Sequence, residues 1–333
     1  MRSRRITALV AALILTVSAC GGETGGSEAV RADGSVDLGK VTLRIGDQKG
    51  TGLQALLKAA GQLDGLPYKV TWSQFTSGPP ILEAINAGSL DFGAVGNAPP
   101  VFAAAAKSKI TIVGVAEKGL GGQAIVVPPG SPIKTPADLR GKAIAVAKGS
   151  SANFHLLAVL SKEGLTFADI KPQYLQPPDA LAAFSSGKID AWAIWDPYTA
   201  QAESQAKARI LVDGEGYANG FEFQITGQEA LADKAKAEAL GDYVSRIRKA
   251  HTWANSHPDE WAKVFSELSG LPEPVVAAAV RRGGFTDLPL DDQVIAREQQ
   301  VADAFSQAKL IPGTVRIADI VDRRYNDTLE SAS

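Results

Sequence analysis

The sequence predicts an α/β protein made of two similar lobes, each an alternation of strands and helices. The first observation is an internal repeat: KGTG at residues 49–52 returns as KGSS at 148–151, and GSLD at 88–91 returns as GKID at 187–190. Both pairs lie 99 residues apart (148 − 49 and 187 − 88). The second observation is that short β-type runs alternate with helical runs in both copies, as is typical of α/β domains.

The first copy has the pattern of four strands separated by three helices. Apolar runs predict the strands, and apolar residues three and four positions apart predict the helices. We expect strands at 41–46, 69–72, 92–95 and 111–115, and helices at 53–60, 81–87 and 100–106. Since each helix connects two strands, we expect a parallel, doubly wound sheet with helices on both faces.

The second copy repeats this order. We expect strands at 143–147, 171–174, 191–194 and 209–212, and helices at 154–162, 180–185 and 198–204. The runs Ile144-Ala145-Val146 and Ala191-Trp192-Ala193-Ile194 are apolar without alternation, which suits strands buried on both faces.

The chain after residue 229 changes to long helical stretches rich in Ala, Glu, Lys and Arg, with little strand signal. We expect this segment to pack on the first lobe. The chain then crosses between the lobes twice, near 123–127 and 221–226, and these two β-like segments form a hinge. The expected domains are lobe 1 at 39–124 with 225–333, and lobe 2 at 125–224.

The N-terminus has the pattern of an export signal. A basic start is followed by an apolar run at 6–17, which is too short to span a bilayer as a helix, so residues 1–19 are expected to be a signal peptide. Val17-Ser18-Ala19-Cys20 resembles a bacterial lipobox, which implies that Cys20 is lipidated. The alternative is a plain secretory peptide with an unpaired thiol. Residues 20–38, rich in Gly and Ser, then predict a flexible tether.

Composition fits a globular body on that tether. The 333-residue chain is 45% hydrophobic and 21% charged, with a formal net charge of −2. This balance argues against nucleic acid as a partner and means that any recognition of an anion must be local. We expect a monomer, held at the outer face of the membrane or in the periplasm by its lipid.

Several segments together resemble a known family. They are Gln48-Lys49-Gly50, Ser77-Gly78-Pro79, the run from Gly96 to Phe102 (GNAPPVF), KGSSA at 148–152 and Trp195-Asp196-Pro197-Tyr198. As a set they are similar to the substrate-binding proteins of ABC importers for aliphatic sulfonates, whose relatives bind taurine, nitrate or thiamine precursors. The resemblance implies a type II periplasmic-binding-protein fold that delivers its ligand to permease subunits with their ATPase. Many sulfonate binders have Asp-Thr where this chain has Asn97-Ala98.

The residues themselves point to an anion site. Gly149, Ser150 and Ser151 lie where a strand ends and a helix begins, so unpaired N–H groups and hydroxyls can meet an oxyanion there. The alternative is that Ser150 or Ser151 only caps the helix. Ser77, Gly78 and Pro79 also precede a helix, and a glycine permits close approach of the backbone.

Two further positions are matched by the repeat. Asn97 and Asp196 both follow strands at the carboxyl ends where open α/β sheets bind ligands, and Trp195 precedes Asp196. Trp195 alternatively packs between the lobes, and Asp196 alternatively caps the next helix. Gln48, Asn153 and Tyr198 lie in or beside the resembling segments, and we expect them in the ligand site as well.

An enzyme is the rival class of function. The chain has three histidines and one cysteine, and none of the motifs Cys-x-x-Cys, His-Glu-x-x-His or Gly-x-Ser-x-Gly. Thiamine-pyrimidine synthases, which share the fold, need a cysteine-rich segment that is missing from this sequence. We therefore expect a binding protein with no catalytic residue, cofactor or metal, whose ligand is a small organic anion such as an alkanesulfonate.

Overall fold

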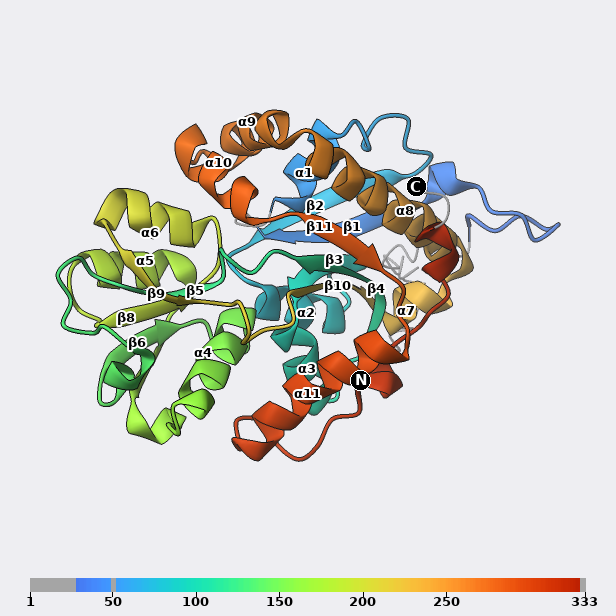
Figure 1. The fold of residues 1–333 in the computed structure, drawn as a ribbon. Helices are drawn as coiled ribbons and strands as arrows, with labels where there is room; N and C mark the ends of the chain where they lie inside the picture. The colour runs from blue at the N-terminus through green and yellow to red at the C-terminus, as the bar shows by residue number, and fades with distance from the viewer. Residues whose placement is uncertain (1–27, 49–51, 330–333) are drawn as a thin grey trace, which may run out of the picture.

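The structure is a computed structural model, and it describes residues 28–48 and 52–329. Its strands form two sheets, which lie in two halves of the molecule (Figure 1). The first sheet has six strands in the order β11-β4-β10-β3-β1-β2. They are β1 (Thr42–Gln48), β2 (Lys69–Phe75), β3 (Phe92–Gly96), β4 (Ile110–Lys118), β10 (Phe221–Gly227) and β11 (Phe285–Leu288).

The second sheet has five strands in the order β7-β6-β8-β5-β9. They are β5 (Ala124–Val127), β6 (Ala143–Val146), β7 (Lys171–Tyr174), β8 (Ala191–Ile194) and β9 (Arg209–Asp213). The apolar runs 144–146 of β6 and 191–194 of β8 are buried throughout, as predicted, and so is every residue of β5.

Helices connect and cover the strands. Those of the two repeats are α1 (Leu53–Ala59), α2 (Gly78–Asn86), α3 (Ala98–Ala105), α4 (Ser151–Lys162), α5 (Pro177–Ser185) and α6 (Tyr198–Ala206). Those of the C-terminal part are α7 (Gln228–Ala232), α8 (Lys234–Ser256), α9 (Pro258–Ser269), α10 (Glu273–Arg282) and α11 (Asp292–Gln307). Short 3₁₀ turns are η1 (Leu38–Lys40), η2 (Pro136–Leu139), η3 (Phe167–Asp169), η4 (Ile317–Ile320) and η5 (Asn326–Leu329).

The repeat in the sequence is a repeat in the structure. Helices α2 and α5 begin 99 residues apart and both have 9 residues. Each predicted strand and helix of both copies is present, and the sheet orders match when β2, β1, β3 and β4 are paired with β7, β6, β8 and β9. The two-lobe α/β prediction is confirmed.

The strands β1, β2 and β3, and β6, β7 and β8, pair in parallel as predicted, but three further strands run antiparallel to their neighbours. β5 pairs antiparallel with β8 and β9, β10 pairs antiparallel with β3 and β4, and β11 pairs antiparallel with β4. β5 and β10 are the strands that enter each sheet after the chain has crossed from the other one. They take the same place in the two sheets. β10 lies between β3 and β4, and β5 lies between β8 and β9, the strands that correspond to β3 and β4 in the repeat.

The crossing segments differ from the predicted hinge in one respect. The β-like parts of 123–127 and 221–226 are β5 and β10, which are strands held inside the sheets. The chain passes between the sheets just before them, at residues 119–123 and 214–220. The expected lobe boundary at 124/125 falls at the start of β5, and the one at 224/225 falls inside β10.

The C-terminal part packs on the first sheet, as expected. Leu240, Tyr243 and Ile247 of α8 belong to the same buried cluster as Leu43 and Ile45 of β1. The strand β11 is a correction, because the sequence after residue 229 was expected to be helical. Its four residues pair with β4 at the sheet edge, and none of them is fully buried, so the strand leaves a weak apolar signal.

The second part of the predicted tether, residues 28–38, is packed against the protein and is not a flexible linker. Residues 28–38 lie against the first core: Ala29 is fully buried, and Val30 pairs with Val36 in a β-bridge. Apolar contacts therefore hold this segment in spite of its small polar residues. The expected signal peptide at 1–19 and Cys20 lie outside the described residues.

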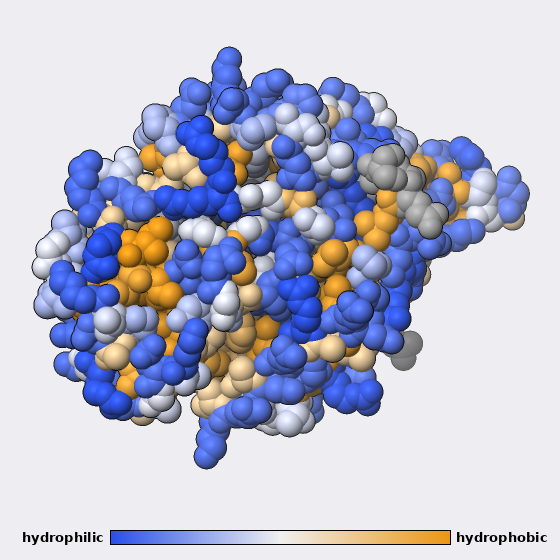
Figure 2. Space-filling view, in the orientation of Figure 1, coloured by the Kyte–Doolittle hydropathy of each residue, from blue (hydrophilic) through white to orange (hydrophobic). Residues whose placement is uncertain are grey.

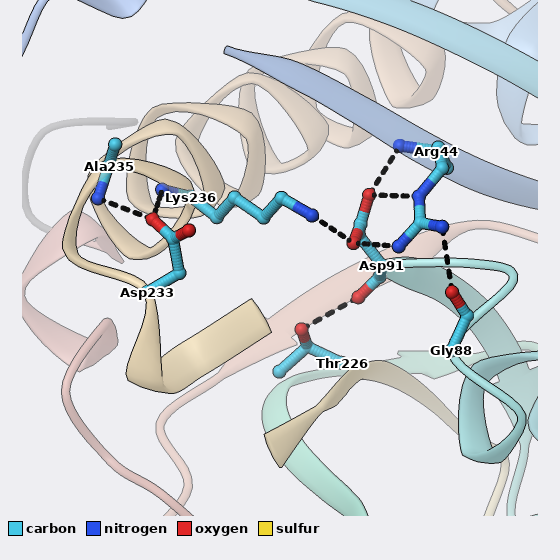
Figure 3. A network of polar contacts seen from close by, with 7 residues as sticks. All are labelled: Arg44, Gly88, Asp91, Thr226, Asp233, Ala235 and Lys236. Atoms are coloured by element: carbon cyan, nitrogen blue, oxygen red, sulfur yellow. Dashed lines mark hydrogen bonds and ion pairs between the residues drawn. The ribbon is translucent and has the colours of Figure 1, made fainter. Parts of the chain in front are cut away.

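The repeated Gly-x-x-Asp motif has a structural role. The carboxylate of Asp91 accepts hydrogen bonds from the backbone N–H and the guanidinium of Arg44 (Figure 3). It also accepts one from Nζ of Lys236, a residue of α8, at 2.9 Å. Burial alone would raise the pKa of Asp91, but the bonds from Arg44 and Lys236 outweigh it and hold the pKa below its usual value. In the second copy, Asp190 accepts from the N–H of Ala143 at the equivalent place. The carboxylates thus fix the start of β1 and β6.

The face of the molecule seen in Figure 2 is mostly hydrophilic, with hydrophobic residues in separate patches. Among the residues that the structure describes, we find no helix with the length and apolar character needed to cross a membrane.

Candidate ligand-binding cleft

A cavity of about 410 Å³ lies where the two halves of the molecule meet. Its lining comes from the ends of β1, β3, β4 and β8, the starts of α2, α3, α4 and β10, the two crossing segments, and the C-terminal part from Ala254 to Phe285. The carboxyl ends of parallel strands are the usual place for ligands in α/β sheets.

Seven of the twelve residues predicted for the ligand site line this cavity: Gln48, Gly78, Asn97, Ser150, Ser151, Trp195 and Asp196. The other five, Ser77, Pro79, Gly149, Asn153 and Tyr198, lie beside them without lining it. The loop 49–51, which the repeat matches to the start of α4, is outside the described residues.

The start of α4 presents two backbone N–H groups without a hydrogen-bond acceptor in the described part of the chain. Gly149 N–H donates to Asn153 Oδ1 at 2.9 Å, and Ser150 N–H donates to the carbonyl of Ala147. Ser150 caps the helix, since its Oγ accepts from Asn153 N–H. The amides of Ser151 and Ala152 in the first turn remain. The N–H groups of Gly149 and Ser150 are thus used within the protein, and those of Ser151 and Ala152 are the donors left at the predicted anion site.

The hydroxyl of Ser77 forms a hydrogen bond between the two halves. Ser77 is fully buried, and its Oγ donates to Oε1 of Gln176, the residue before α5, at 2.8 Å. Thr76 Oγ1 donates to the same oxygen at 2.9 Å. Gly96 meets the other half as well, because a Cβ at this position would lie 2.9 Å from Ser151 Cβ. Here glycine permits the close approach of β3 to α4.

Asp196 is bound by protein groups. Its Oδ1 accepts from the N–H of Ala200 at 3.0 Å and lies 3.5 Å from a guanidinium nitrogen of Arg282. Its Oδ2 is buried against Gly122 and has no hydrogen-bond partner among the residues that the structure describes. Burial raises the pKa of Asp196 to about 6, although the positive charge of Arg282 opposes the rise. Arg282 lies on α10 and also pairs with Glu203 of α6, so it joins the C-terminal part to the second half.

Asn97 connects the cavity to a crossing segment. Its Nδ2 donates to Asn219 Oδ1 at 2.8 Å, and Asn219 Nδ2 donates to Glu298 Oε2 at 3.0 Å on α11. Glu298 is fully buried, and burial raises its pKa well above the usual value. This network holds the crossing segment at residues 214–220 against the first half.

The aromatic residues predicted for the site lie together. Trp195 and Tyr198 contact each other edge to face, with ring centroids 6.4 Å apart. Trp195 lines the cavity and also packs against the second core. Burial raises the pKa of Tyr198.

The sequence reasoning missed the wall contributed by the C-terminal part. Trp261 and Phe265 of α9, Arg282 of α10, and Phe285 of β11 line the cavity, and so does Lys118 at the end of β4. Helical periodicity shows that α9 has a buried face, but it does not show that this face borders a ligand site. The one sequence-based expectation that bears on this wall is that the segment after residue 229 packs on the first lobe.

Among residues 28–48 and 52–329, we find no group of three His, Cys, Asp or Glu side chains arranged to hold a metal ion. His155 is fully buried in α4, and burial lowers its pKa to about 4. A neutral, enclosed imidazole fits a packing role.

Comparisons with known proteins agree with this architecture. The family model described as NMT1/THI5 like matches residues 70–261. A protein of Escherichia coli (strain K12), named for binding aliphatic sulfonates, is 38% identical over 94% of this chain and 95% of its own length. One of the same name from Bacillus subtilis (strain 168) is 31% identical over 85% of this chain and 86% of its own.

A solved structure extends the similarity to the fold. The alkanesulfonate-binding protein SsuA from Xanthomonas axonopodis pv. citri, bound to MOPS, is 37% identical to this chain. It superposes with a TM-score of 0.79 and covers 85% of this chain and 98% of its own. The fold is therefore that of the periplasmic binding proteins, as the sequence predicts. The chain belongs to the NMT1/THI5-like family, together with the aliphatic sulfonate-binding proteins that it resembles over most of its length.

Proposed function

We propose that this protein is the extracytoplasmic solute-binding component of an ABC importer and that it captures an aliphatic sulfonate between its two halves. The observation that carries the proposal is the 38% identity over 94% of the chain to a protein named for binding aliphatic sulfonates. The cavity between the halves provides a place for such a ligand.

The start of α4 supports an anionic head group. The N–H groups of Ser151 and Ala152 point from the positive end of a 12-residue helix, and backbone amides at a helix start favour oxyanions. Ser150 and Ser151 border the same cavity. We propose that the sulfonate oxygens bind here, with Gln48, Gly78 and Trp195 completing the site and Ser77, Pro79, Gly149, Asn153 and Tyr198 supporting it.

Taurine is the alternative ligand to be distinguished. Its ammonium group needs a carboxylate oxygen that faces the cavity and has no partner. In Asp196, Oδ1 is bound by the N–H of Ala200 and by Arg282, and Oδ2 is buried against Gly122. Asn97, where many relatives have Asp, donates to Asn219. These contacts favour a sulfonate without an ammonium group. Proteins that bind nitrate or a thiamine precursor share the fold, but no contact of this cavity favours either ligand.

The remaining proposals concern the protein's setting. We propose a signal peptide at 1–19, a lipid on Cys20, a monomeric state, and delivery of the ligand to permease subunits with their ATPase. We also propose that the protein is not an enzyme; relatives that are 31%, 37% and 38% identical to it are named binding proteins. Metabolic labelling with a fatty acid tests the lipid: Cys20→Ser should abolish the label, and a labelled variant would contradict the lipobox.

A ligand panel tests the main proposal. Isothermal titration and thermal unfolding with ethanesulfonate, taurine, nitrate and a hydroxymethylpyrimidine should show binding of ethanesulfonate in preference to the others. A ligand at 100 times its dissociation constant adds ~2.7 kcal/mol to the free energy of unfolding, which a shift in melting temperature reports. Recovery of ethanesulfonate unchanged after prolonged incubation should accompany binding. Preference for nitrate or the pyrimidine, or conversion of the sulfonate, would contradict the proposal.

A further inference from the structure

We propose that Glu298 of α11 is a positioning residue for ligand binding. It lies outside the cavity lining, and it acts through Asn219 of the crossing segment 214–220 on Asn97, which lines the cavity. This inference rests on the proposed function for its ligand. It names a residue that sets the affinity for that ligand without touching it.

The hydrogen bonds that join these side chains run in one direction. Phe221 N–H donates to Asn219 Oδ1 at 3.2 Å, and Asn97 Nδ2 donates to the same oxygen at 2.8 Å. A backbone N–H can only donate, so the Asn219 amide must turn its oxygen toward Phe221 and its nitrogen away. That nitrogen donates to Glu298 Oε2 at 3.0 Å. The arrangement therefore requires a hydrogen-bond acceptor at residue 298.

The carboxyl of Glu298 serves this one contact. Its side chain is fully buried, and Asn219 is its one hydrogen-bond partner within the described residues. The neighbouring cation, Arg297, pairs with Glu117. Burial raises the pKa of Glu298 well above the usual value, although the bond from Asn219 opposes the rise. A buried acid is costly for a fold where an apolar side chain would also pack, so we assign the carboxyl to holding Asn219.

Arg297 holds the same crossing segment through its backbone. Its Nη2 donates to the carbonyl of Asn219 at 3.1 Å, and its guanidinium lies 4.3 Å over the ring of Phe221. The same nitrogen bonds Glu117 at 2.8 Å, next to the end of β4, where the first crossing segment begins. Two consecutive residues of α11 thus bind the ends of both crossing segments. Such segments are where lobes bend relative to each other, so their position affects how the lobes meet.

Two parts of the cavity lining depend on Asn219. Gly220 and Phe221 follow it directly in the chain, and Asn97 is bonded to its side chain. Without an acceptor at residue 298, the Asn219 amide either leaves its N–H unpaired or turns away from Asn97. Both results loosen the crossing segment and Asn97 together. Affinity then falls, because ligand binding must order both parts again.

Glu298→Gln and Glu298→Met separate the acceptor from the size of the side chain. Gln keeps an acceptor oxygen, so the affinity for ethanesulfonate should stay within about twofold of wild type. Met has a similar length without that oxygen, and the affinity should fall about five- to 20-fold. Val301→Ala, at a buried apolar position of the same helix, is the matched control. It should lower the melting temperature more than Glu298→Met does and leave the affinity unchanged.

A double-variant cycle tests whether Glu298 acts through Asn219. Asn219→Ala removes the amide, and it should lower the affinity about as much as Glu298→Met does. Since the interaction is then already lost, the combined variant should bind at most about twofold more weakly than Asn219→Ala alone. Full addition of the two losses would show that Glu298 affects binding independently of Asn219, and it would overturn the inference.

Amide hydrogen exchange provides a readout that needs no ligand. Phe221 N–H bonds to the Asn219 side chain, and Lys118 N–H bonds to the carbonyl of Gly220. Both amides should exchange at least about fivefold faster in Glu298→Met than in wild type, and at the wild-type rate in Glu298→Gln.

The outcomes separate this inference from the proposed function. Wild-type affinity and wild-type exchange in Glu298→Met overturn the positioning role and leave the proposed function standing. A wild-type protein that binds no sulfonate contradicts the proposed function, and the exchange rates then decide the positioning role. If Glu298→Met fails to fold, Asn219→Ala is used for both measurements, and wild-type values in that variant overturn the inference.

Discussion

Ser77 and Gln176 occupy equivalent positions of the two repeats, 99 residues apart, and they are joined by a hydrogen bond of 2.8 Å from Ser77 Oγ to Gln176 Oε1. Each precedes the matching helix of its own half, α2 or α5. The same Gln176 oxygen accepts from Thr76. Residues that the repeat makes equivalent thus face each other between the halves, and this contact holds the halves together as the structure has them.

Gln176→Ala should therefore weaken ligand binding by destabilising the arrangement of the two halves that forms the cavity. It removes two hydrogen bonds worth ~1 kcal/mol each and leaves the buried Ser77 hydroxyl without a partner, so affinity should fall roughly 10- to 30-fold. Titration measures the affinity, and X-ray scattering should show a smaller contraction of the variant on adding ligand. Gln173→Ala, on the exposed strand β7, is the control. Equal affinities of Gln176→Ala and wild type would show that this contact does not support the bound state.

Gly96→Ala tests the second contact between the halves. An added Cβ would lie 2.9 Å from Ser151 Cβ, which is closer than such atoms approach, so β3 and the start of α4 must move apart. We expect at least a threefold loss of affinity and a small change in melting temperature, because the backbone of an L-residue tolerates the conformation of Gly96. Unchanged affinity would mean that the halves bind ligand without this close approach.

The sequence allowed the two-lobe fold to be predicted because the repeat preserves both the order and the spacing of the elements. It did not show that β5 and β10 run antiparallel, since an apolar run has no direction and only the crossing of the chain sets it. The position of Ser77 at a helix start was predicted from Gly78 and Pro79, but its partner Gln176 was not, because a hydroxyl serves a ligand or a neighbouring lobe equally well. The C-terminal wall depends on tertiary packing of α8, α9 and α10, which periodicity leaves open.

Asp196→Asn should flatten the dependence of stability on pH. The pKa of Asp196 is raised from 3.8 to about 6 by burial, so the folded protein binds a proton that the unfolded chain releases. Stability should therefore fall as the pH rises from ~4 to ~6, by up to ~1.4 kcal/mol per unit of pKa difference, and stay reduced above pH 6. Thermal unfolding from pH 4 to 8 measures this. The exposed Glu215→Gln should follow the wild-type curve, and an Asp196→Asn curve parallel to wild type would contradict the raised pKa.

The same variant tests whether Asp196 meets the ligand. Because its Oδ1 is bound by Ala200 and Arg282, Asp196→Asn should change the affinities for taurine and ethanesulfonate by the same factor. A carboxylate that contacted an ammonium group would contribute ~1.5 to 3 kcal/mol to taurine binding alone. Titration of both ligands decides, and a selective loss of ten-fold or more for taurine would assign Asp196 to the ligand.

Ser151→Pro should weaken binding more than Ser151→Ala, because it removes a backbone donor at the start of α4. Ser151 is the first residue of the helix, a position where proline is well tolerated, and Ser150 has the extended backbone (φ −84°, ψ 167°) that a following proline requires. The variant should therefore fold. A hydrogen bond from this N–H to a charged sulfonate is worth ~1.5 to 3 kcal/mol, so the affinity of Ser151→Pro should fall tenfold or more below that of Ser151→Ala. Ser161→Pro near the end of the same helix is the matched control for helix damage, and it should lower the melting temperature far more. Titration with ethanesulfonate at a temperature where both Ser151 variants are folded measures the difference, and equal affinities of the two would show that the Ser151 amide does not bind the sulfonate.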